Sequence, residues 1–161
     1  MSTEIKPIIF WVPGIPPTVN HYKTPIKIRT RTGEVRESFA ITKEAEAYRQ
    51  TVAIFARGRS IAPAFNNHAA RKRIRYGLCV TVFLGKGDRG DGDNFWKCLA
   101  DALAHAHVIH SDARVKVWHM DVVSNDRDNP ANPRHLICVF EVDNDSRTWA
   151  EQMLDEYGES K

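Results

Sequence analysis

The chain has 161 residues, of which 42% are hydrophobic, 9% aromatic and 27% charged, proportions that exclude a wholly disordered or fibrous protein. Its 23 Lys and Arg residues against 20 Asp and Glu residues leave a net charge of +3, which permits an anionic partner without requiring one. A chain of this length favours one domain, so we expect a single domain over residues 1–161, with loose termini at residues 1–7 and 158–161.

Nothing in the sequence indicates a membrane or secreted protein. The longest nearly uncharged apolar stretch, residues 77–85, is far shorter than the roughly 20 residues that span a bilayer. The first six residues lack the charged-then-apolar order of a signal peptide. The three cysteines are odd in number and widely spaced, which favours reduced core thiols over a disulfide frame. We therefore expect a cytoplasmic protein with no membrane partner.

The first half of the chain predicts strands followed by a helix. β-branched and aromatic residues mark the strands, and apolar residues at helical spacing mark the helix, which Thr42 is suited to cap. Pro25 stands just before one strand, where a missing N–H donor does least harm. The predicted elements are a strand over residues 8–12, a proline-rich loop over 13–17, hairpin strands over 26–30 and 34–39 around a basic turn, and a helix that ends near residues 57–58.

The second half alternates strands and helices again. Its predicted elements are a loop over residues 58–67, a strand over 76–84, a helix over 93–106, strands over 115–123 and 135–142, and a terminal helix over 145–157. This order predicts an α+β fold: a single domain with a mixed β-sheet and helices packed mainly on one face.

Positive charge gathers in two places, the predicted hairpin and a run near residue 72. Basic side chains at such places contact the phosphates of a nucleic acid without reading its sequence. The alternative is that they are ordinary solvated loops. The candidate DNA-binding residues are Lys27, Arg29, Arg31, Arg71, Lys72 and Arg73.

The residues best suited to chemistry follow the strand over residues 76–84. Asp91 and Asp93 are two residues apart, so in an extended chain their carboxylates share a face and can approach one hard cation. Asp93 can also cap the helix that follows, which would hold it in a rigid position. Alone this pair is a weak indication, since calcium loops and many turns contain it, and an aspartate before a helix is most often only a cap.

Three charged residues of that helix, Asp93, Lys97 and Asp101, are spaced four apart and share one side. Lys97 would lie one turn from the acidic pair, where its ammonium could meet a phosphate oxygen. Asp101 could position Lys97 or merely cover the helix face, and we favour the second interpretation. Asp112 follows the helix and can fold back beside it only if the two flanking strands are neighbours.

Two further sets of residues have open interpretations. His105, His107 and His110 form a solvated helix end or a DNA-facing patch, and a zinc site is disfavoured because no cysteine joins them at ligand spacing. His21 and Tyr22 either steer DNA or simply pack the N-terminal loop.

Taken together, these residues resemble the RusA family of Holliday junction resolvases, endodeoxyribonucleases of bacteria and their phages. The resemblance covers roughly residues 8–143, and its central motif is specific. The matching residues are the Pro-Gly-x-Pro segment that ends at Asn20, the stretch from Thr42 to Arg49, and the series Asp91, Asp93, Asn94, Lys97, Asp101, Ala102, Leu103 and Asp112.

The resemblance implies a homodimer that introduces paired nicks into branched DNA, the four-way junction, using Mg²⁺, for which Mn²⁺ can substitute. It implies no small-molecule cofactor. Three alternatives stay open: a nuclease for forks and flaps, a DNA-binding module of the same fold without catalysis, and a calcium-stabilised structural protein.

The resemblance also assigns roles to residues. It implies that Asp91, Asp93 and Asp112 bind the metal and act in catalysis, together with Lys97 as the catalytic lysine. Two departures from the family pattern occur: the family often has paired acids where this chain has Ser111 and Asp112, and after the helix it usually has glycine where this chain has His107. A residue other than glycine in a left-handed cap costs about 1 kcal/mol.

Overall fold

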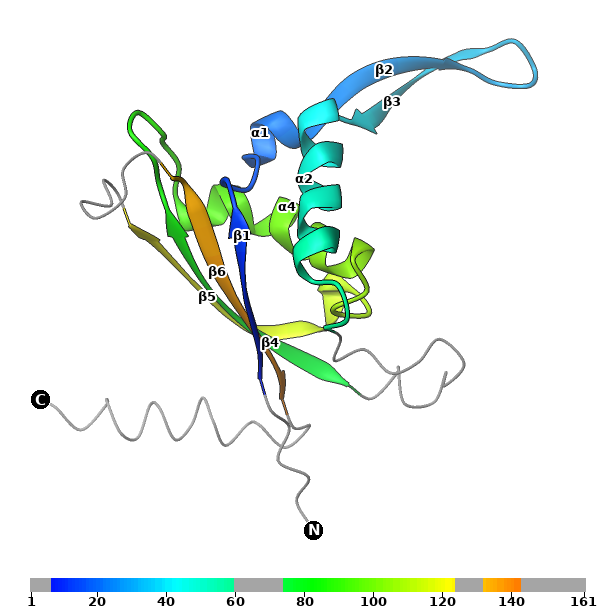
Figure 1. The fold of residues 1–161 in the computed structure, drawn as a ribbon. Coiled ribbons are helices and arrows are strands. Elements are labelled where there is room, and N and C mark those ends of the chain that lie inside the picture. The colour runs from blue at the N-terminus through cyan, green and yellow to red at the C-terminus, as the bar shows by residue number, and fades with distance from the viewer. Residues whose placement is uncertain (1–6, 60–73, 124–131, 143–161) are drawn as a thin grey trace, which may run out of the picture.

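A four-stranded sheet forms the body of the molecule. The computed structural model describes residues 7–59, 74–123 and 132–142, and within them the strands lie in the order β1-β6-β4-β5 (Figure 1). β4 and β5 run parallel, whereas β6 is antiparallel to β1 and β4, so the sheet is mixed as predicted. The strand bounds are β1 Ile8–Pro13, β4 Arg75–Phe83, β5 Val115–Val123 and β6 Arg134–Val142.

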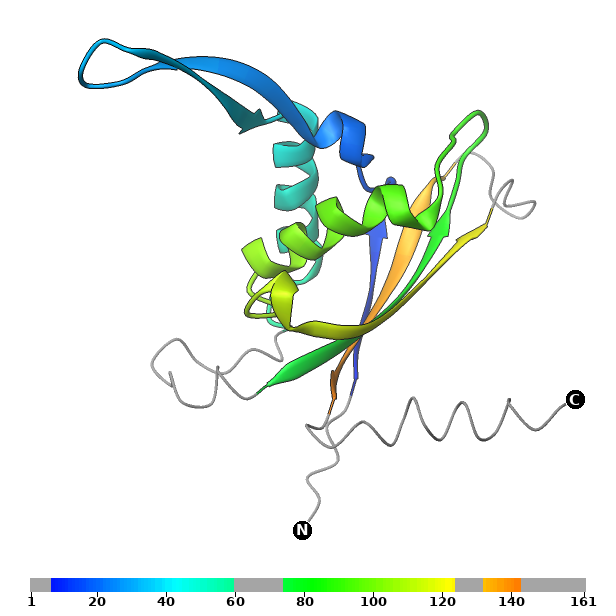
Figure 2. The same ribbon diagram turned by 180° about the vertical axis from the view of Figure 1, so that it is seen from behind.

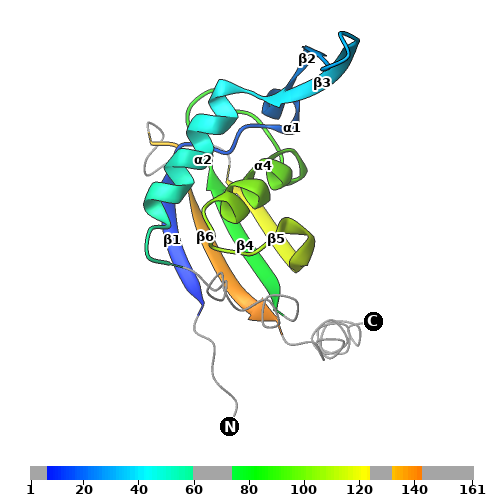
Figure 3. The same ribbon diagram turned by 90° about the vertical axis from the view of Figure 1, so that its right-hand side faces the viewer.

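Three helices in the described residues complete a single small α+β domain: α1 Val19–Tyr22, α2 Lys43–Phe55 and α4 Gly92–His105. α2 and α4 lie against one face of the sheet (Figure 3). Alternate strand residues face these helices and are fully buried with them, because only one side of each pleated strand can point to the core. The strand residues include Val12, Leu78, Val82 and Ile137, and the helix residues packed with them include Leu99 and Leu103 of α4. None of the described helices is long and apolar enough to cross a membrane.

α4 crosses over from β4 to β5, the kind of connection that a parallel strand pair requires. Its first residue, Gly92, packs on the middle of β5, where an added Cβ would lie 3.3 Å from the Cβ of Met120. β5 begins at Val115, which pairs with Tyr76 of β4. The expected adjacency of these strands is therefore confirmed, and the chain before β5 returns to the side of α4.

A two-stranded ribbon, here called the arm (residues 23–41), projects away from the body (Figures 1 and 2). It pairs β2 (Lys23–Arg29) with β3 (Val35–Ile41), which confirms the predicted hairpin, and most of its residues are exposed. The prediction that Pro25 precedes the first strand is wrong, because Pro25 pairs with Phe39 inside the ribbon. Both strands of a two-stranded ribbon are edge strands, and an edge strand tolerates the missing N–H donor.

The helix ends follow capping rules, with one correction. Thr42 caps α2 as predicted, its hydroxyl accepting from the backbone N–H of Ala45 at 3.2 Å. Asp91, not Asp93, is the N-cap residue of α4, because Gly92 already has helical geometry. At the other end His107 adopts φ 57°, and the next residue's N–H bonds the carbonyl five residues back, which is the Schellman arrangement that normally uses glycine.

Several predictions concern residues outside the described ranges. They are almost all of the loop over 58–67, the terminal helix over 145–157, the loose termini except Pro7, and the basic residues Arg71, Lys72 and Arg73.

Candidate functional site

The site is centred on the side chain of Lys97, in the second turn of α4. Its Nζ lies 2.5 Å from Oδ2 of Asp112 and 3.0 Å from Oδ1 of Asp101. Asp112 opens a single 3-10 turn, η1 (Asp112–Arg114), immediately before β5. These three side chains, called the acid–lysine cluster below, come together because the crossover places η1 beside α4.

The contact between Lys97 and Asp112 shifts the pKa of each group in the direction that favours its charged form. The hydrogen bond from the Lys97 ammonium lowers the pKa of Asp112 below its usual 3.8, and the same contact raises the pKa of Lys97 above 10.5. Both groups are therefore charged at neutral pH. The Lys97 side chain is 47% exposed and that of Asp112 34%, so water screens the pair, which contributes at most about 1 kcal/mol to folding.

Asp91 and Asp93 stand at the start of the same helix. The Asp91 carboxylate makes no capping bond to the helix and instead accepts a hydrogen bond from the side-chain amide of Asn94. Asp93 is exposed in the first turn, where the helix dipole favours a negative charge. The expectation that both acids lie in extended chain and share a face is wrong, because the helix begins between them at Gly92.

The predicted metal ligands do not form a ready-made group. Among residues 7–59, 74–123 and 132–142, no three His, Cys, Asp or Glu side chains gather as they would around a metal ion. α4 starts over Met120, five residues into β5, which offsets it from the start of β5 by roughly 16 Å along the strand. Asp112 is accordingly paired with Lys97, in the second turn of α4. Carboxylate oxygens suit Mg²⁺ chemically, but here the Asp112 carboxylate is paired with an ammonium.

Asp101 has a second set of partners on its far side. The Tyr22 hydroxyl of α1 donates to Asp101 Oδ2 at 2.5 Å, and Nη2 of Arg49 in α2 donates to that hydroxyl at 2.5 Å. Burial and the bond to Asp101 raise the pKa of Tyr22 to about 12. The interpretation that Asp101 merely covers the helix face is therefore wrong: the Asp101 side chain is 19% exposed and joins three helices.

Tyr22 and Arg49 are the residues that sequence reasoning missed in this role. Tyr22 is 3% exposed, which excludes direct stacking on DNA and leaves the packing alternative. Its contact with Asp101 joins residues 79 positions apart, so no local spacing pattern could have indicated it.

His135 was also missed. This buried residue of β6 donates from Nδ1 to the carbonyl of Gly14 at 3.0 Å, so its Nε2 accepts from the Tyr48 hydroxyl at 2.9 Å. Burial lowers the pKa of His135 to about 4, which keeps the ring neutral. It ties β6 to α2 and to the loop after β1.

The three histidines near the end of α4 are exposed and lie at the opposite end of the helix from Asp91. His105 is the last helical residue, and His107 takes the left-handed cap position. The backbone N–H of His110 donates to the Tyr76 hydroxyl at 3.2 Å.

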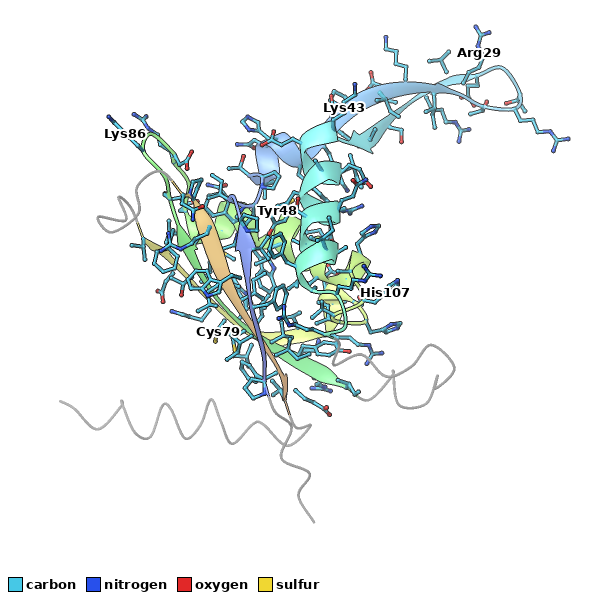
Figure 4. All side chains as sticks on the ribbon, in the orientation of Figure 1. Arg29, Lys43, Tyr48, Cys79, Lys86 and His107 are labelled. Carbon is cyan, nitrogen blue, oxygen red and sulfur yellow. The ribbon has the colours of Figure 1, made fainter. Side chains whose placement is uncertain are left out.

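The predicted DNA-binding residues that are described all lie on the arm. Lys27 and Arg29 are exposed on β2, and Arg31 is exposed in the turn. Figure 4 shows Arg29 toward the free end of the arm and Lys43 close to its root. The arm therefore presents its basic side chains away from the body.

No protein-family model matches the chain, and no curated protein matches it. The likeness to RusA-type resolvases consequently rests on the motif residues themselves.

Proposed function

We propose that the protein is a Mg²⁺-dependent endodeoxyribonuclease that resolves four-way DNA junctions by paired nicks, as its likeness to the RusA family implies. One observation carries this proposal: Lys97 is held between Asp101 and Asp112 on the helix whose first residues include Asp91 and Asp93. An ordinary ion pair on the surface of α4 would involve only Lys97 and Asp101. The meeting of Lys97 with Asp112 across the crossover supports a common role.

The geometry suits Lys97 to the recognition of a reacting phosphate. Its ammonium has three N–H donors, and the two aspartates use two of them. The remaining donor is available to a phosphate oxygen, since the side chain is 47% exposed. A fixed positive charge at that oxygen stabilises the transition state as negative charge develops.

The resemblance implies that Asp91, Asp93 and Asp112 would hold Mg²⁺; of these, Asp91 and Asp93 stand at the start of α4, whereas Asp112 is paired with Lys97. When bound, Mg²⁺ supplies an activated water and offsets the negative charge of the phosphate. The chain's own contribution is to place the carboxylates of Asp91 and Asp93 at the N-terminal, positive end of the α4 dipole, and the Asp91 carboxylate makes no capping bond to the helix.

The arm supplies the attraction for DNA. Lys23, Lys27 and Arg29 are separated by even numbers of residues along β2, so their side chains share one face of the ribbon. All three are exposed, and phosphate contacts of this kind give affinity that depends on salt but not on sequence. A four-way junction has two-fold symmetry, so two copies of the chain in a C₂ dimer would present two equivalent sites for paired cleavage.

The proposal is tested by nicking assays in Mg²⁺ on a four-way junction, a Y-shaped fork and a plain duplex. The wild-type protein is expected to nick the junction preferentially, and Asp93→Asn and Asp112→Asn are expected to lose nearly all activity. Asp121→Asn, an exposed acid on β5 paired with His119, is the control and is expected to behave as wild type. Full nicking by Asp93→Asn would show that the metal assignment is wrong.

Two other results would redirect the proposal. Equal cleavage of junction and fork would identify a broader nuclease for branched DNA, and tight junction binding without cleavage would identify a DNA-binding module. Calorimetric titration with Mg²⁺ separates the roles of Asp112: unchanged Mg²⁺ affinity in Asp112→Asn would make it a counter-ion of Lys97 only.

A further inference from the structure

Behind Lys97, a chain of polar contacts runs through three helices. It passes from Arg49 in α2 to the Tyr22 hydroxyl in α1, then to Asp101 in α4, and finally to Lys97. The side chains of Arg49 and Asp101 are only 16% and 19% exposed. Burying polar and charged groups costs free energy unless hydrogen bonds replace their contacts with water. A chain of linked polar side chains, three of them largely buried, therefore calls for a functional explanation.

The same tyrosine lies at the root of the arm. Tyr22 is the last residue of α1, and β2 begins at the next residue, Lys23. Its carbonyl accepts from the backbone N–H of Thr42, the residue that follows β3 and caps α2, at 3.1 Å. Both strands of the arm thus leave the body at Tyr22 and Thr42, and the Tyr22 side chain continues inward to the acid–lysine cluster.

We propose that Tyr22 is a positioning residue: its hydroxyl fixes the Asp101 carboxylate, and Asp101 thereby holds the Lys97 ammonium in place relative to the root of the arm. The catalytic consequence rests on the proposed nuclease function. The structural consequence, an ordered Lys97, does not.

The direction of the Tyr22 hydrogen bond follows from its partners. A phenol has one O–H to donate, and Arg49 occupies the acceptor side of the oxygen. The proton of Tyr22 is therefore directed at Oδ2 of Asp101, which leaves Oδ1 for Lys97. Arg49 does not bond Asp101 directly in this structure, because its Nη2 is 4.0 Å from Asp101 Oδ2, beyond hydrogen-bonding distance.

The fold offers a matched control in Tyr48. Its side chain is also buried, and its hydroxyl bonds one neighbour, Nε2 of His135 at 2.9 Å, where the Tyr22 hydroxyl bonds both Asp101 and Arg49. It leads to β6 rather than to α4. Tyr22→Phe and Tyr48→Phe each remove one phenolic hydroxyl, so a difference between them reports on the contact with Asp101 and not on the loss of a buried polar group.

The first readout needs no activity. Hydrogen bonds to two carboxylates slow the proton exchange of an ammonium, so the test follows the side-chain ¹H–¹⁵N correlation of Lys97, which Lys97→Arg would assign by its absence. We expect this signal in the wild type and in Tyr48→Phe, and its loss in Tyr22→Phe. An unchanged Lys97 signal in Tyr22→Phe, with the protein folded as judged by urea denaturation, would overturn the inference.

The second readout is junction nicking. Tyr22→Phe is expected to lower kcat about 10–100-fold, the usual effect of removing a partner behind a reacting group, with KM unchanged. Tyr48→Phe is expected to retain wild-type kcat, and equal losses in both variants would overturn the inference. If the wild type nicks no substrate, the proposed function fails, and the Lys97 signal alone decides the role of Tyr22.

Discussion

The arm and the acid–lysine cluster use charged residues in opposite ways. On the arm, Lys27 and Arg29 are exposed on a ribbon held to the body only at its root. In the cluster, Lys97 is neutralised by two aspartates, one of which a buried tyrosine holds in turn. The contrast shows that long-range attraction of a polyanion needs charges left open to solvent, whereas positioning one ammonium needs charges already satisfied within the chain.

The largest expected effect breaks the cluster at its centre. Lys97→Ala removes the only ammonium in the cluster, so nicking of a four-way junction should fall about 10²–10³-fold. Junction binding, measured by fluorescence anisotropy, should stay close to wild type because the arm is intact. Lys86→Ala, an exposed lysine in the β4–α4 connection, is the control. Residual activity above a tenth of wild type would contradict a role for Lys97 in the reaction.

Lowering the pH should destabilise the folded domain, because His135 is buried in its neutral form. The pKa of this histidine is about 4 in the folded protein and about 6.5 when unfolded, so between these values the unfolded chain binds the extra proton. Stability from this group is complete above pH 6.5 and falls by roughly 3 kcal/mol as the pH drops to 4.

Urea denaturation at pH 7 and pH 4 checks this prediction. The double variant Tyr48→Phe/His135→Leu replaces both hydrogen-bonding partners with apolar groups and should lose less stability than wild type over the same interval. Equal losses would show that acid acts through other groups.

Changing the arm should affect binding and leave chemistry alone. Replacing Lys27, Arg29 and Arg31 by alanine should reduce the slope of log affinity against log salt by about 2.7, because three phosphate contacts are lost. kcat at saturating junction should be unchanged. Exchanging Lys for Arg and Arg for Lys at the same positions keeps the charge and should keep the slope; a reduced slope in that variant would mean that side-chain shape matters.

The smallest expected effect tests the scaffold of the cluster. An alanine Cβ at Gly90 would lie 2.3 Å from the ring of Phe95, which is buried in the first turns of α4. Gly87 also has a positive φ, 89°, but nothing lies within 4 Å of its Cβ position. Gly90→Ala should therefore lower the free energy of unfolding by about 1 kcal/mol or more beyond the loss in Gly87→Ala. Similar losses would mean that Phe95 moves freely.

Local rules predicted most of the described fold. Strand composition, helical spacing and capping residues depend on near neighbours in the chain. The arm, α2 and the succession of strands along the chain could therefore be predicted from the sequence. α1 was missed because a helix of four residues carries no periodic signal.

The site was less predictable, because its contacts join distant elements. The pattern of Asp91, Asp93 and Lys97 could be read from the sequence, but the offset between α4 and β5 that places Asp112 beside Lys97 depends on how the helix packs. The bond from Tyr22 to Asp101 depends on the packing of α1 against α4, which no short motif describes.

The number of cross-strand pairs in the arm sets both how far it extends and which face each side chain occupies. β2 spans seven residues, about 23 Å, and each cross-strand pair removed would shorten the reach by about 3.4 Å. Deleting one pair would also turn Arg29 to the opposite face, whereas deleting two would restore its original side. Homologous ribbons of unequal length would therefore present their basic side chains on a common face only if they differ by an even number of pairs.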